Sequence, residues 1–214
     1  MLFVHDIFII TCVISYEEAD GAKERMKGEE IMYYSTYYKS PVGDIIIASD
    51  DNNIIGLWID EQKYIGNTMP RNITQKDELP ILQEARAWLD KYFAGKKPEL
   101  SSLSLAPIGG EFKQQVWRIL LEIPYGELTT YGSIAKEVAK RMGKERMSAQ
   151  AVGGAVGHNP ISIIIPCHRV VGSNGSLTGY AGGIDMKVRL LEHEGVDMSG
   201  LFMPKKGVSR GRSC

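Results

Sequence analysis

The segment Pro166-Cys167-His168-Arg169 places a potential nucleophile beside two basic side chains. A thiolate, and not a thiol, is the reactive form of cysteine, so such chemistry needs a basic or cationic neighbour. The proline interrupts the apolar run 161–165 just before the cysteine, and His168 and Arg169 are both able to favour the thiolate. We therefore predict that Cys167 is a nucleophile, against the alternative that it is a small core residue.

Other cysteine chemistries fit the sequence less well. There is no CxxC motif, which excludes a thioredoxin-type redox pair. His158, His168 and His193 with one cysteine form no recognised metal-ligand pattern, so we expect no metal. A cysteine hydrolase stays open, with His168 or His158 as the base and Asn159 or Glu194 as the group that orients it.

The elements that must position these residues differ between the two halves of the chain. Residues 33–60 alternate β-rich runs with turns and predict a small antiparallel meander. We expect a loop over 61–78, a helix that begins at Pro80 and ends before Gly95, and a linker over 96–109.

Three short helices are predicted in the second half. Apolar residues between Phe112 and Leu121 mark the first, Thr129 or Thr130 can cap the second, and the third begins near Ser148. The last two helices suggest a helix-turn-helix, although any helical hairpin would give a similar pattern. The third helix is almost free of bulky side chains, which fits either tight packing or close approach to a ligand or groove.

The cysteine follows what reads as a buried strand. Residues 161–165 are the strand candidate, and Val170-Val171 continue an extended run after the cysteine. A last helix is expected to be capped by Asp185 and to end near Glu194.

Composition bounds the class of protein. The 214 residues are 43% hydrophobic and 24% charged, a globular balance with room for one large domain or two small ones. Residues 1–109 carry a net charge of −6 and residues 110–214 one of +5, which allows an anionic partner for the second half. Three cysteines are too few for a disulfide framework, and we expect a reducing compartment, the cytoplasm.

The first 31 residues do not share the patterning of the rest. His5 and Asp6 break an apolar run that is too short to span a bilayer, so no membrane association is expected. If the source is bacterial, residues 27–30 can be encoded by AAAGGAGAAGAA, which contains a purine-rich ribosome-binding site. We expect that 1–31 is translated upstream sequence and that the protein starts at Met32; a true N-terminal extension is the alternative.

The motifs around the cysteine resemble those of the O6-alkylguanine-DNA alkyltransferase family. The resemblance is strong over 110–196 and looser over 32–105, which is similar to the family's variable N-terminal domain. It rests on three motifs: Ile165-Pro166-Cys167-His168-Arg169-Val170, Gly154-Ala155-Val156-Gly157-His158-Asn159-Pro160 and Gly179-Tyr180-Ala181-Gly182-Gly183.

The resemblance implies a role for each matching residue. Cys167 would attack the alkyl carbon, His168 would act through a water as base toward the thiol, and Glu194 would orient and charge-stabilise that histidine. Tyr131 would help to turn the nucleotide out and could donate a proton toward N3 of the leaving guanine. Asn159 would lie in the hinge between the groove helix and the active-site strand.

The same resemblance implies a base pocket and a surface for the DNA minor groove. Val170 and Tyr180 would line the pocket, or simply pack in the core, and Gly182 would leave room for larger alkyl groups. Gln150 stands where many members of the family have an arginine that fills the gap left by the flipped base, so Arg146 or Lys144 could assist it. The implied DNA-binding residues are Gln150, Ala149, Gly153, Arg146 and Thr130.

Together these features predict an α+β fold with a small N-terminal antiparallel sheet plus a helix, then a helical domain with a winged helix-turn-helix. The expected parts are the extension 1–31, domains 32–105 and 110–200, and a tail 201–214. The implied function is single-turnover repair of O6-alkylguanine in double-stranded DNA by a monomer without a cofactor. A non-catalytic sensor of alkylated DNA and a cysteine hydrolase are the alternatives.

Overall fold

Three strands form the predicted meander, and a fourth joins it. The computed structural model describes residues 31–60, 62 and 69–204; the prediction about 1–31 lies, except for Ile31, outside the described residues, as does most of the predicted tail. Strands β1 (Tyr33–Ser40), β2 (Gly43–Ser49) and β3 (Ile54–Ile59) are antiparallel neighbours. Strand β4 (Ile73–Gln75) pairs in parallel with β1, so the prediction of a loop throughout 61–78 was wrong there. The sheet order is β3-β2-β1-β4.

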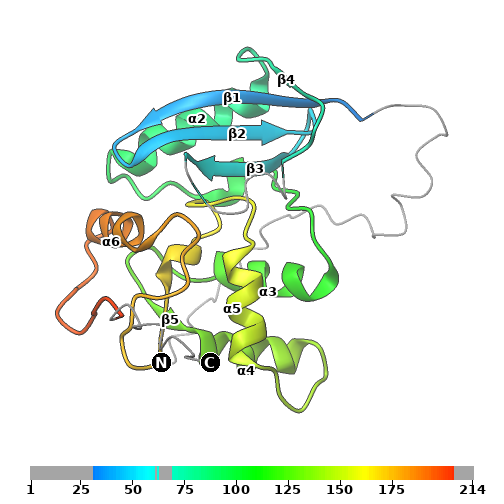
Figure 1. Ribbon diagram of the computed structural model, residues 1–214. Helices are drawn as coiled ribbons and strands as arrows, with labels where there is room; N and C mark the ends of the chain where they lie inside the picture. The colour runs from blue at the N-terminus through cyan, green and yellow to red at the C-terminus, as the bar shows by residue number, and fades with distance from the viewer. Residues whose placement is uncertain (1–30, 61, 63–68, 205–214) are drawn as a thin grey trace, which may run out of the picture.

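Helix α2 (Pro80–Phe93) covers one face of this sheet (Figure 1). Pro80 occupies the first turn, where a missing N–H costs nothing, and Gly95 follows the helix with φ 71°, as predicted. The buried face of the helix packs on apolar side chains of the strands in one core cluster. On the face of the sheet opposite to α2, Ala48, Ile55 and Trp58 form a smaller cluster.

The predicted linker over 96–109 connects the two halves and is packed against them. It contains a short 3₁₀ helix, η2 (Leu100–Ser102), and the side chains of Leu103 and Leu105 are buried. Leu105 forms a parallel bridge with Ile54 of β3. This connection therefore belongs to the core between the two halves of the chain.

The second half contains the predicted helices α3 (Glu111–Leu121), α4 (Tyr131–Arg141) and α5 (Ala149–Gly157). One of the two residues predicted to cap α4 does so, because the Thr130 hydroxyl accepts from the Ser133 N–H at 3.1 Å. Helix α5 starts after Ser148, as expected, and the Ser148 hydroxyl accepts from the Gln150 N–H at 3.2 Å. Helix α5 packs against both α3 and α4, so α4 and α5 form the helix-turn-helix (Figure 1).

Two local predictions near the cysteine were wrong. Residues 161–165 form turns instead of a strand, and Ile163 adopts φ 70°, which is rare for a β-branched residue. Glycine at position 183, with φ 87°, occupies the N-cap of α6 (Ile184–His193), so Asp185 lies within the first turn and does not cap it. Strands β5 (Thr129–Thr130) and β6 (Val170–Val171) form a separate parallel pair.

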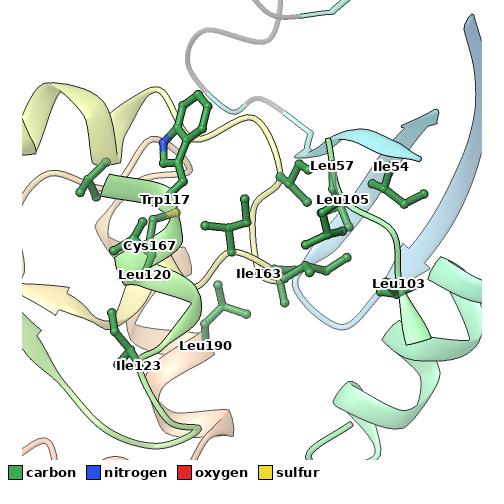
Figure 2. Close-up of a cluster of buried hydrophobic side chains, with 14 of the residues drawn as sticks. Ile54, Leu57, Leu103, Leu105, Trp117, Leu120, Ile123, Ile163, Cys167 and Leu190 are labelled. Carbon is green, nitrogen blue, oxygen red and sulfur yellow. The ribbon is translucent and has the colours of Figure 1, made fainter. Parts of the chain in front are cut away.

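One hydrophobic core joins the two halves. Figure 2 shows it running from Ile54 and Leu57 of β3 past Ile163 to Leu120, with Cys167 in the same cluster. The backbone joins the halves as well, because the Leu57 N–H donates to Pro160 O at 2.8 Å and the Ser162 N–H donates to Leu57 O at 2.9 Å. The N-terminal sheet thus holds the segment that leads to the cysteine.

None of the helices in the described part of the chain has the length and apolar character that a membrane span requires.

Candidate active site

Cys167 begins a 3₁₀ turn, η3 (Cys167–Arg169), immediately after Pro166. Only 4% of the residue is exposed, and its Sγ accepts a hydrogen bond from Asn159 Nδ2 at 3.1 Å. Asn159 also donates to Ile165 O at 2.8 Å and accepts from the Ile161 N–H at 3.0 Å. One amide side chain therefore fixes both the thiol and the turn segment in front of it.

Burial of the thiol opposes its ionisation, and two neighbouring groups act against this effect of burial. Burial raises the pKa of Cys167 above its ordinary value, and the hydrogen bond from Asn159 and the charge of Lys187 offset only part of that increase. Burial lowers the pKa of Lys187 to about 8, against a raising effect of Cys167. The Lys187 ammonium donates to the carbonyls of Val170 and Thr178, the second at 3.0 Å. A cation is thus fixed close enough to the sulfur to favour the thiolate.

His168 and Glu194 form a buried pair. His168 Nε2 lies 2.7 Å from Glu194 Oε1, and neither side chain is exposed to solvent. Since a carboxylate only accepts, we assign the proton to Nε2, which leaves Nδ1 with a lone pair. Within the described residues Nδ1 has no hydrogen-bonding partner. Burial lowers the pKa of His168 despite the opposing effect of Glu194, so the neutral form that can accept a proton is favoured.

Arg169 forms hydrogen bonds with the Glu194 carboxylate, whereas we expected it to favour the Cys167 thiolate. Its Nε donates to Glu194 Oε2 at 2.8 Å, its Nη2 donates to Oε1 at 2.9 Å, and Nη1 donates to Ile123 O at 2.6 Å. Burial raises the pKa of Glu194, but the hydrogen bonds and charges of His168 and Arg169 outweigh that effect and leave it well below its usual value. Glu194 is therefore an anion that orients the histidine.

Tyr131 stands at the start of α4 and reaches the loop before Tyr180. Its hydroxyl donates to Thr178 O at 2.8 Å, and burial, followed by the effect of Cys167, raises its pKa. A Cβ added at Gly179 would lie 2.3 Å from that hydroxyl, so the glycine permits the close approach. The predicted proton donor thus lies near the cysteine, with its proton directed at a backbone carbonyl.

The three predicted pocket residues lie on β6 and in the loop before α6. Val170 is fully buried, and Tyr180 is buried with a hydroxyl that has no partner in the described part of the chain. A Cβ at Gly182 would approach Tyr180 Cε1 to 2.8 Å and Met186 Cγ to 3.6 Å. Any larger residue at 182 would therefore press on the Tyr180 ring.

The predicted DNA-contacting residues lie at the starts of α4 and α5, in the turn between these helices and within α5. Gln150 and Ala149 are exposed in the first turn of α5, and Arg146 is exposed in the turn before it. Gly153 packs near Tyr131, whose ring a Cβ would meet at 3.8 Å, and Thr130 caps α4. Small and polar side chains thus leave the α5 backbone accessible.

Sequence reasoning missed three contributors to the site. Lys187 precedes Leu190 and Leu191 by three and four residues, a spacing that places it on the apolar face and could have revealed it. Gly126, with φ 78°, donates its N–H to Glu194 Oε2 at 3.1 Å. Tyr92 of α2 donates its hydroxyl to Glu194 Oε1 at 2.8 Å, across 102 positions of sequence that no local pattern connects.

Metal ligation receives no support from the described residues. No group of three or more His, Cys, Asp or Glu side chains among them could hold a metal ion. Within the same residues Cys167 is the free cysteine.

Both halves of the chain match models of one protein family. Residues 32–107 match "6-O-methylguanine DNA methyltransferase, ribonuclease-like domain", and 111–196 match "6-O-methylguanine DNA methyltransferase, DNA binding domain". The chain therefore belongs to the O6-methylguanine DNA methyltransferase family, which confirms the predicted resemblance and the predicted α+β fold class.

Individual relatives agree with the family match. A methylated-DNA–protein-cysteine methyltransferase of Haemophilus influenzae is 44% identical over 161 residues, 75% of this chain and 86% of the relative. The protein of that name from Methanosarcina acetivorans is also 44% identical, over 77% of this chain and 99% of its own length. A crystal structure of Mycobacterium tuberculosis OGT in complex with DNA superposes with a TM-score of 0.63 at 38% identity, covering 77% of this chain and 92% of that one.

Proposed function

We propose that this protein repairs O6-alkylguanine, mainly O6-methylguanine, in duplex DNA by moving the alkyl group irreversibly to its own Cys167. The observation that carries the proposal is the buried Cys167 thiol hydrogen-bonded to Asn159, beside a neutral histidine oriented by Glu194. The relatives named for this activity support it. Such a protein is a methylated-DNA–[protein]-cysteine S-methyltransferase that acts once, as a monomer in the cytoplasm.

The proposed reaction is a direct displacement at carbon. The thiol proton passes through a water to His168 Nδ1, and the resulting imidazolium is stabilised by Glu194. Sγ of Cys167 then attacks the alkyl carbon, a C–S bond forms, and the C–O6 bond breaks with its electron pair going to the guanine. Tyr131 supplies a proton toward N3 of that leaving base, after its hydroxyl has turned away from Thr178 O. The His168 imidazolium then gives up its proton and the Tyr131 tyrosinate regains one through solvent, and exchange with water moves the guanine proton from N3 to N1. The products are therefore S-alkylcysteine and unmodified guanine.

The base must leave the helix before this step, because the thiol is buried. We propose that the N-terminal part of α5 enters the minor groove, with Ala149 and Gly153 allowing the close approach and Arg146 and Thr130 contacting the backbone. Gln150 then occupies the gap in the base stack. Val170 and Tyr180 hold the extruded base, and Gly182 leaves room for its alkyl group.

The experiment is transfer from duplex DNA that carries one radiolabelled O6-methylguanine. We expect one label per protein chain, in a form that survives denaturation, and no label on Cys167→Ala, which should still bind the DNA. A non-catalytic sensor would bind and transfer nothing. A hydrolase would release label into solution over many turnovers. Stoichiometric labelling of the Cys167→Ala protein would remove this cysteine from the proposed role.

A further inference from the structure

Tyr92 connects the N-terminal domain to the His168–Glu194 pair. It lies on α2, packed against the sheet, and only 1% of the residue is exposed. Its hydroxyl donates at 2.8 Å to Glu194 Oε1, the oxygen that also accepts from His168 Nε2 at 2.7 Å. We propose that Tyr92 is a positioning residue for alkyl transfer, which acts from the N-terminal domain through Glu194 on His168. This inference rests on the function proposed above.

The ring of Tyr92 is held on several sides, so its hydroxyl has little freedom. It stacks on Trp88 with centroids 5.5 Å apart and meets Tyr125 edge-on at 5.9 Å. The backbone is fixed too, because His193 Nε2 lies 2.8 Å from Tyr92 O. A preorganised donor of this kind can determine where a carboxylate lies.

The Tyr92 hydroxyl acts on His168 through the oxygen Oε1 of Glu194. This oxygen accepts from Tyr92, His168 and Arg169 Nη2, while Oε2 accepts from Arg169 Nε and the Gly126 N–H. Each donor to Oε1 takes up part of the carboxylate charge, which leaves less of it for the imidazolium. Removal of the Tyr92 hydroxyl should therefore make His168 more basic and leave Glu194 less firmly oriented.

The other ionisable groups around the pair come from three places. Tyr125 lies in the loop after α3, and Cys167 and Arg169 flank His168 in η3. Lys187 and His193 belong to α6, and the His193 ring lies 5.1 Å from that of Tyr92. None of these side chains changes in a Tyr92 variant, so a change in pH dependence can be assigned to the hydroxyl.

The test is the single-turnover rate of Tyr92→Phe as a function of pH, with labelled O6-methylguanine duplex as substrate. His168 must be neutral to accept the thiol proton, so the rate falls on the acid side as it becomes protonated. In Tyr92→Phe we expect the midpoint of this acid limb to move upward by about half a pH unit, which is about a threefold lower rate at pH values below the midpoint. A purely structural role would lower the amount of active protein and leave the midpoint unchanged.

Two further variants sharpen the test. Tyr38→Phe removes a hydroxyl of the same domain that donates to Asp90 at 2.9 Å on the surface, and its acid limb should match the wild type. 3-Fluorotyrosine at position 92 retains the hydroxyl and makes it a stronger donor, so the midpoint should move downward. This replacement also keeps the proposal testable if Tyr92→Phe fails to fold. Coincident midpoints in wild type, Tyr92→Phe and the fluorotyrosine protein would overturn the role of Tyr92, whereas absence of transfer by the wild type would overturn the proposed function itself.

Discussion

At the scale of single residues, the site before reaction depends on two groups that are each held in one protonation state. Glu194 is held as an anion by His168 and Arg169, and His168 is held neutral by burial. Both folded-state pKa values lie below the ordinary ones. Between the folded and the ordinary values the unfolded chain binds more protons than the native protein, so stability must rise with pH there.

We therefore predict acid sensitivity. The free energy of unfolding should decrease as the pH falls below the ordinary histidine pKa of about 6.5, and fall further below the ordinary glutamate value of about 4.3. Urea denaturation at a series of pH values measures this slope. Glu122→Gln, which removes an exposed carboxylate paired with Arg141, is the matched control and should keep the slope, while Glu194→Gln should reduce the slope below about pH 4.3, where this carboxyl group is protonated in the unfolded chain. Equal slopes in the wild type and Glu194→Gln would contradict the prediction.

The sequence indicated which residue types gather near the cysteine, but it did not indicate their side-chain partners. Cys167, His168 and Asn159 stand close together in sequence, and the motif indicated them. Arg169 was assigned to the thiol because it is two residues away, whereas its hydrogen bonds go to Glu194 and Ile123. In the sequence, Tyr92 could be recognised only as an apolar position of the helix that begins at Pro80. Partners that meet through tertiary packing leave no periodic signal in a single sequence.

At the scale of secondary structure, capping residues made α4 and α5 predictable. Thr130 and Ser148 accept backbone N–H groups at the helix starts, a local interaction that depends on few neighbours. The strand predicted over 161–165 was wrong, because the apolar, β-branched composition of these residues is that of a buried strand although their backbone forms turns. Their backbone instead bonds to Leu57 of the other half, and Ile163 takes a positive φ. Here packing between the halves overrides local propensity.

Helix α5 also permits a test of the residue proposed to fill the base stack. Gln150→Ala should slow transfer from duplex DNA and spare reaction with free O6-benzylguanine, which needs no base flipping. Gln150→Arg should speed the duplex reaction, since a longer cationic side chain fills the gap and gains contacts to phosphate or base. The measurement is the ratio of the duplex rate to the free-base rate, because it cancels damage to the thiol site. A ratio that stays constant in both variants would mean that Gln150 is only a surface residue.

At the scale of the whole molecule, the reacting sulfur belongs to the core that joins both halves. Cys167 is one of the buried members of that cluster, together with residues of β3, α2 and α3 (Figure 2). A methyl group on the sulfur adds volume where packing is tight, and a thioether accepts the Asn159 hydrogen bond less well. Overpacking of this kind costs about 1–3 kcal/mol.

The methylated protein should therefore unfold at a temperature several degrees below that of the unreacted protein. Differential scanning calorimetry before and after reaction with an O6-methylguanine oligonucleotide, with the DNA removed, measures the change. Cys167→Ala taken through the same treatment should show no decrease. An unchanged or higher unfolding temperature after stoichiometric methylation would show that the site accommodates the added group without strain.

A substitution in strand β3, outside the proposed DNA-binding residues, can be enough to abolish the repair reaction. The Leu57 N–H donates to Pro160 O and the Leu57 carbonyl accepts from the Ser162 N–H, so both bonds hold the segment next to the asparagine that contacts the thiol. A proline at position 57 would remove one of these bonds without altering any residue near the bound base. Substitutions in β3 that break these backbone bonds should therefore inactivate the protein, and a mutational screen limited to the neighbourhood of the cysteine would overlook them.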